Sequence, residues 1–160
     1  MPLLALGVYL LFAAVAFGWR TWRQYRTTGD HGFRGLSGRT GSLEWCGGLL
    51  LSAAMVLAAL APLAQAAGFL PAIHVLESRR TGMLGLGLAL TGFALTVAAQ
   101  LQMRASWRIG VDEGERTQLV TGGPFAVVRN PIFSGMLLVL AGMVMMAPTV
   151  PALLAFVFAA

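Results

Sequence analysis

Long apolar runs separated by short polar segments make up most of this sequence. Residues 2–18 form an uncharged run of about the minimum length that crosses a bilayer as a helix. Further apolar runs occupy residues 46–70, 81–103 and 131–147. A last run, residues 151–160, is too short to cross the hydrocarbon core, and we expect it to be a span that is cut short. The pattern predicts an all-α, polytopic transmembrane helix bundle with four complete spans.

Some positions modify these spans. Pro62 and Gln65 interrupt the second run, which predicts a helix that tilts, kinks or dips back at its far end. In the third run, Thr81, Gly85 and Ala89 recur every four residues. Because a stripe of small residues lets another helix approach closely, we expect the third helix to have a tightly packed neighbour.

Aromatic and arginine side chains alternate after the first run: Trp19, Arg20, Trp22, Arg23, Tyr25 and Arg26. This mixture is typical of the headgroup layer, where aromatic rings and snorkelling arginines anchor a helix. An RNA-binding surface is the alternative interpretation. Ser42 and Glu44 then mark the start of the second helix.

Composition strengthens the membrane interpretation. Hydrophobic residues make up 58% of the chain and charged residues 11%, with a mean hydropathy of +0.77. These values favour a single integral-membrane domain over residues 1–160. All 11 basic residues are arginines, and they lie between the apolar runs without forming a continuous basic face. We therefore predict a lipid bilayer as partner and no nucleic acid, despite a pI near 11.1.

The distribution of arginines predicts the orientation. The connection between the first two spans and the connection between the third and fourth hold most of them. By the positive-inside rule these connections face the cytoplasm, and the N-terminus lies outside. The first run lacks a positively charged leader, so we expect a retained span rather than a cleaved signal peptide. The expected location is a bacterial-type plasma membrane, and the oligomeric state stays open.

Isolated titratable residues give no sign of a metal site. Cys46 is the single cysteine, and neither His31 nor His74 has a histidine, cysteine or acidic cluster around it. A solvated loop is the simplest interpretation of the densest acidic group, which is Asp112, Glu113 and Glu115.

The most specific pattern lies within residues 100–149. Gly122-Gly123-Pro124 predicts a turn. Asn130 and Pro131 then predict the start of a helix, because Asn caps a helix well and Pro suits its first position. Gln102 ends the preceding span, where a polar amide usually faces protein or water rather than lipid.

These residues resemble the cofactor motif of the integral-membrane isoprenylcysteine carboxyl methyltransferase and phospholipid methyltransferase superfamily. That motif reads Gly-x-Phe/Tyr, a short spacer, then Arg-His-Pro-x-Tyr. Here it reads Gly123-x-Phe125, followed by Arg129-Asn130-Pro131-x-Phe133, so Asn stands in place of His and Phe in place of Tyr. Unlike His, Asn does not titrate near neutral pH. A second cofactor segment, which the family has beyond its last span, has no match in this sequence.

The resemblance implies an S-adenosylmethionine-dependent methyltransferase that releases S-adenosylhomocysteine and acts on a lipophilic acceptor, as isoprenylcysteine carboxyl methyltransferases do. It implies catalytic roles for Arg129 and Asn130. The implied cofactor-binding residues are Val120, Gly123, Phe125, Arg129, Asn130, Pro131 and Phe133. We expect the acceptor to contact Gln102, Trp107 and Arg108. Methyl transfer needs mainly alignment and exclusion of water, which suits a chain without a catalytic triad.

Simpler interpretations stay open at this point. Arg129 is also explained as a positive-inside anchor, Asn130 and Pro131 as a plain helix cap, and Trp107 and Arg108 as interfacial anchors. For a methyltransferase, the sequence does not choose among a thiol, a carboxylate of a prenylated or similar molecule, and a lipid amine as the acceptor group. The alternative class is a non-enzymatic membrane scaffold or a small transporter subunit.

Overall fold

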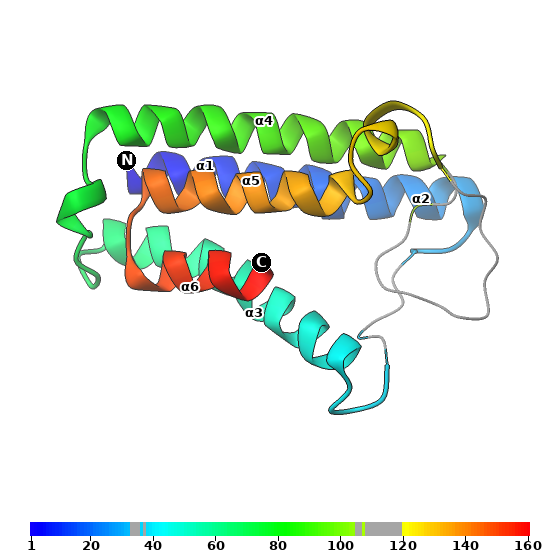
Figure 1. Cartoon of the computed structure of the whole chain (residues 1–160), viewed down its shortest axis with the longest axis horizontal. Helices are drawn as coiled ribbons and strands as arrows, with labels where there is room; N and C mark the ends of the chain where they lie inside the picture. The colour runs from blue at the N-terminus through cyan, green and yellow to red at the C-terminus, as the bar shows by residue number, and fades with distance from the viewer. Residues whose placement is uncertain (33–35, 37, 105–106, 108–119) are drawn as a thin grey trace.

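The computed structural model describes residues 1–32, 36, 38–104, 107 and 120–160 (Figure 1). In chain order its elements are α1 (Pro2–Ala13), η1 (Ala14–Trp19), α2 (Arg20–Thr28), α3 (Leu43–Ala66), η2 (His74–Leu76), α4 (Arg79–Met103), η4 (Gly123–Ala126), α5 (Pro131–Met146) and α6 (Val150–Ala159). Every regular element in this part of the chain is a helix. The predicted all-α bundle of apolar helices is confirmed.

In the part of the chain that the structure describes, three helical segments are long and apolar enough to cross a membrane: Pro2–Thr28, Leu43–Ala66 and Arg79–Met103. α5 and α6 are shorter apolar helices. α5 has 16 residues, slightly fewer than the roughly 20 that a spanning helix needs.

The first helix extends beyond the apolar run of residues 2–18. α1, η1 and α2 follow one another without a break, so the helix runs past Gly18 to Thr28. η1 is a π-helical segment in its middle. The helix ends where Gly29 adopts a left-handed φ of 74°. The aromatic and arginine residues expected to follow the span therefore form its last turns.

α3 begins as predicted and ends earlier. Ser42 caps it by accepting a hydrogen bond from the Trp45 N–H at 3.3 Å. Pro62 remains inside the helix. The helix stops at Ala66 rather than at residue 70, because Gly68 takes a left-handed φ of 79° and turns the chain.

α4 and α5 are antiparallel neighbours that approach through glycines (Figure 1). We call Gly85 and Gly92 of α4 and Gly135 and Gly142 of α5 the glycine contact. A Cβ at Gly92 would lie 2.7 Å from the Val139 nitrogen, and a Cβ at Gly85 would lie 2.7 Å from the Gly142 carbonyl oxygen. Any larger side chain would collide with backbone. The tightly packed neighbour predicted from the stripe of small residues is α5.

α1 joins this pair to α3. The Tyr9 hydroxyl donates to the Met55 carbonyl of α3 at 2.6 Å. Phe12 contacts Phe93 of α4 edge to face, with ring centres 5.6 Å apart. α6 packs along α3, which tilts away from the other helices toward its own N-terminal end (Figure 1).

Figure 1 also shows where the segments that carry the predicted motif lie. α2, the C-terminal end of α4 and the start of α5 lie at one end of the bundle, which we call the motif end. The chain start, η2 and the beginning of α4 lie at the opposite end.

Candidate functional site

A tight glycine turn leads into α5. Gly123 adopts a left-handed φ of 59°, which glycine tolerates best. From there η4 forms one short 3-10 turn, in which the Phe125 N–H donates to the Gly122 carbonyl at 3.3 Å and the Val128 N–H donates to the Pro124 carbonyl at 3.0 Å. The turn predicted from these residues is present.

Asn130 caps α5 as predicted. Its side-chain oxygen accepts from the Phe133 N–H at 3.1 Å, and its backbone carbonyl accepts from the Ser134 N–H at 3.0 Å. Pro131 occupies the first turn and is fully buried. Asn130 therefore has a structural role that is independent of any ligand.

The fold brings Gln102 to the glycine turn. A Cβ at Gly122 would lie 3.3 Å from the Gln102 Nε2, and a Cβ at Gly123 would lie 3.6 Å from the Gln102 Cδ. The side-chain amide at the end of α4 thus lies beside the segment that precedes α5. At Gly122 a side chain would require Gln102 to shift by a few tenths of an ångström, whereas the space at Gly123 allows ordinary contact.

The other predicted residues of the segment differ in exposure. Arg129 and Asn130 are exposed at the N-terminal end of α5. Val120, Phe125 and Phe133 are half-buried. Together with Gly123, Pro131 and Gln102 they lie at the motif end. Arg108, predicted to bind substrate, lies outside the described residues.

Trp107 is buried rather than interfacial. Its side chain is 2% exposed, and the Arg20 guanidinium lies 4.8 Å from the centre of its ring. Gly32 lies on the same ring: a Cβ there would be 3.3 Å from Cζ3 of Trp107. Trp107 therefore joins α2 to the residues after α4. Its ring lies against the Arg20 guanidinium, and the contact of Trp107 with an acceptor stays a prediction.

Arg20 is a functional candidate whose burial the sequence analysis did not predict. A snorkelling residue was expected, yet Arg20 is 3% exposed. Its Nη1 donates to Gln24 at 3.3 Å, and its Nη2 donates to the Arg104 carbonyl. Arg20 and Gln24 are four residues apart, so they share one face of α2. That spacing is a signal in the sequence, but burial depends on Trp107, which comes far later in the chain.

A second buried amide fixes α4 against the same helix. Gln100 is 2% exposed, and its Nε2 donates to the Ala16 carbonyl of η1 at 2.9 Å. π-helical segments occur frequently at functional sites, where they free or redirect backbone groups. This bond holds the first helix and α4 in register just before the motif end.

One cavity of about 420 Å³ lies between α2 and the end of α4. Its lining residues are Arg20, Arg23, Thr27, Leu101 and Arg104. Among the described lining residues three are arginines and none is acidic. The described part of the lining is therefore cationic, and we call this cavity the cationic cavity.

A second cavity, of about 550 Å³, opens among α1, α3 and α5. Its lining is mostly apolar: Tyr9, Ala13, Phe17, Thr21, Leu51, Ser52, Met55 and Met136. Ligand cavities commonly have volumes of about 300–1,000 Å³. An alkyl chain fits the chemistry of this lining.

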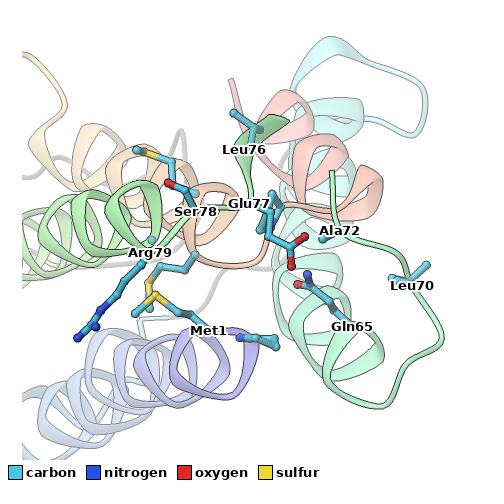
Figure 2. Close-up of a pocket in the computed structure, with 13 residues that line it drawn as sticks. Met1, Gln65, Leu70, Ala72, Leu76, Glu77, Ser78 and Arg79 are labelled. Atoms are coloured by element: carbon cyan, nitrogen blue, oxygen red, sulfur yellow. The ribbon is translucent and has the colours of Figure 1, made fainter. Parts of the chain in front are cut away.

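A third cavity, of about 620 Å³, lies at the opposite end of the bundle. Figure 2 shows that Met1, Gln65, Glu77 and Arg79 surround it: Met1 precedes α1, Gln65 belongs to α3, Glu77 follows η2 and Arg79 begins α4. The Gln65 Oε1 is buried there without a hydrogen-bond partner. None of these three cavities is lined by η4 or by the first turn of α5.

Comparison with known families identifies the C-terminal half of the chain. The family model described as phospholipid methyltransferase matches residues 81–160. This match covers α4, the glycine turn, the capped start of α5, and α6. No curated protein and no solved structure matches the chain.

Proposed function

Because the chain belongs to the phospholipid methyltransferase family, whose members are membrane methyltransferases, we propose that it transfers a methyl group from S-adenosylmethionine to a lipophilic acceptor. The observation that carries this proposal is the family match over α4 and α5. Within that match, Gln102 and Gly123 are adjacent. Two segments that are separate in the sequence thus meet beside the motif.

The cofactor would lie against the glycine turn and the start of α5. Pro131 has no N–H, and the Phe133 N–H is bonded to Asn130, so the helix start offers a ligand fewer donors than an uncapped helix. Arg129 must therefore supply most of the attraction for the carboxylate of the cofactor. Its exposed position at the mouth of α5 suits that role. Gly123, Phe125, Val120 and Phe133 would hold the adenosine part.

The methyl group of the cofactor is already activated by the adjacent sulfonium. The chain therefore needs to align the donor with the acceptor and to exclude water. Arg129 and Asn130 act by position in this proposal, and Asn130 does not need to carry a proton. Gln102 would contact the acceptor beside the turn.

The acceptor would enter from the bilayer. The apolar cavity among α1, α3 and α5 offers a lining for its alkyl chain. Two acceptor classes follow: a carboxylate as in isoprenylcysteine, and the amine of a phospholipid, which the family name suggests. In this proposal the motif end faces the cytoplasm and the N-terminus lies outside a plasma membrane, which the arginine distribution supports through the positive-inside rule.

Cofactor binding tests the proposal directly. Titration calorimetry of the purified chain in neutral detergent should detect S-adenosylhomocysteine binding. Arg129→Ala should weaken this binding by roughly tenfold or more, because a charge-assisted hydrogen bond contributes about 1.5–3 kcal/mol. Arg80→Ala, which removes an exposed arginine at the opposite end of the bundle, is the matched control and should bind normally.

A protein that stays folded yet binds no S-adenosylhomocysteine would contradict the methyltransferase proposal. If binding is present but Arg129→Ala and Arg80→Ala behave alike, the cofactor lies elsewhere. Transfer of a radiolabelled methyl group to isoprenylcysteine analogues and to amine phospholipids, measured in parallel, then distinguishes the two acceptor classes.

A further inference from the structure

The cationic cavity between α2 and α4 is not explained by the cofactor motif. Its described lining residues do not include Arg129 or any residue of η4. Three of them, Arg20, Arg23 and Arg104, carry a guanidinium group. Two come from α2 and one follows α4, so the fold brings together charges that repel one another. A functional reason is needed for this arrangement.

Among the described residues, buried Arg20 contacts no opposite charge. It is 3% exposed, and both of its hydrogen bonds go to neutral oxygens, one on the Gln24 side chain and one on the Arg104 backbone. The Trp107 ring below the guanidinium adds a cation–π contact. Its Nε has no hydrogen-bond partner. A buried cation is costly unless an opposite charge accompanies it.

Arg104 is held in an unusual conformation at the same place. Its φ is +49°, in the left-handed region that a long side chain rarely adopts. In this conformation its carbonyl accepts the bond from Arg20. Such strain persists where the surrounding structure fixes it, often at ligand sites. Arg104 is also one of the residues that line the cavity.

We propose that this cavity binds a phosphate group. Three arginines in one lining, two from α2 and one that follows α4, match the several oxygens and the charge of a phosphate better than a single carboxylate. An anion would complete the hydrogen bonding of Arg20 and turn the repulsion among the arginines into attraction. The proposal does not depend on methyl transfer.

The position of the cavity favours a lipid as the source of the phosphate. It lies beside the last turns of the Pro2–Thr28 span, where headgroups of a bilayer would meet the helix. Leu101 gives it one apolar wall and is 42% exposed, so a lipid chain could leave along α4. A free phosphate is the other source of the same chemistry.

Ligand titration of the chain in neutral detergent tests this site. The probes are dihexanoyl phosphatidic acid, inorganic phosphate, and dihexanoyl glycerol, which has the same chains without phosphate. We expect phosphatidic acid to bind, inorganic phosphate to compete with it, and dihexanoyl glycerol to have no effect. Tighter binding of phosphatidic acid than of phosphate supports a lipid source, and equal binding supports free phosphate.

Two exposed arginines allow the site to be altered without removing buried Arg20. The double variant Arg23→Gln and Arg104→Gln should lower the affinity for phosphatidic acid at least tenfold. Arg26→Gln is the matched control, because Arg26 belongs to the same helix, stacks on Trp22 and does not line the cavity. Its affinity should stay within twofold of the unmodified chain.

Three outcomes would overturn the proposal: binding of dihexanoyl glycerol as strong as that of phosphatidic acid, equal losses in the Arg26→Gln and double variants, or competition by S-adenosylhomocysteine. The last result would assign the cavity to the cofactor carboxylate instead. A failure of cofactor binding leaves this test intact, because its probes contain no cofactor.

Discussion

Two pairs of helices in this protein pack in different ways. α4 and α5 meet through the glycine contact, in which a Cβ would lie 2.7 Å from backbone atoms of the partner helix. α3 and α6 also pack against each other, and most of their buried residues are alanines: Ala54, Ala58, Ala61, Ala152, Ala155 and Ala159. Alanine carries a methyl group that glycine lacks, so alanines do not allow two backbones to approach as closely as glycines do.

The two helix pairs also differ in how they relate to the candidate site. α4 ends at the residues that touch the glycine turn, and α5 begins at the capping residue Asn130, so the glycine contact sets the distance between the two parts of the candidate site. In Figure 1, α6 lies beside α3 away from the motif end. We infer that α4 and α5 fix the site geometry, whereas α3 and α6 complete the bundle.

The largest effect is expected from widening the glycine contact. Gly92→Leu places a side chain where even a Cβ meets the Val139 nitrogen at 2.7 Å. We expect the free energy of unfolding to fall by about 3 kcal/mol or more, which is the upper end of the cost of overpacking a core. Gly87→Leu is the matched control, because nothing lies within 4 Å of a Cβ at Gly87 on the same helix. Unfolding in mixed micelles measures both variants, and equal stabilities would show that the helices do not touch here.

A smaller effect is expected in the alanine pair. Ala58→Leu should destabilise the bundle by about 1–3 kcal/mol, since Ala58 is 2% exposed against the core. The folded fraction should still bind S-adenosylhomocysteine with unchanged affinity. Ala66→Leu, at the exposed end of α3, should alter neither property. A loss of affinity in Ala58→Leu would remove the functional distinction between the two helix pairs.

Local sequence signals predicted local structure well. The apolar runs became helices, and the caps at Ser42 and Asn130 formed as the residue types indicated. Each of these features depends on residues within a few positions of one another. The first helix continues beyond the apolar run of residues 2–18 to Thr28, since a single glycine weakens a long helix without ending it.

Contacts between distant residues could not be predicted in the same way. The sequence pattern around Arg20 is typical of a headgroup anchor. The burial of Arg20 appears only in the folded chain, where its guanidinium lies over the Trp107 ring. The stripe of small residues indicated a close neighbour for α4 but not which helix it was. The contact of Gln102 with the glycine turn likewise depends on how α4 and α5 pack.

The smallest effect is expected at Asn130, where substitutions distinguish a role as helix cap from a role in cofactor binding. Asn130→Ala removes the acceptor for the Phe133 N–H and should cost about 1 kcal/mol of stability. Asn130→Asp keeps an oxygen at the cap and should retain most of that stability. Its negative charge beside Arg129 would nevertheless oppose the cofactor carboxylate, so S-adenosylhomocysteine should bind less tightly than to the unmodified chain. Thermal unfolding and calorimetry on the same samples distinguish these results. If Asn130→Asp is stable and binds normally, Asn130 is a cap alone, and the cofactor proposal then depends on Arg129.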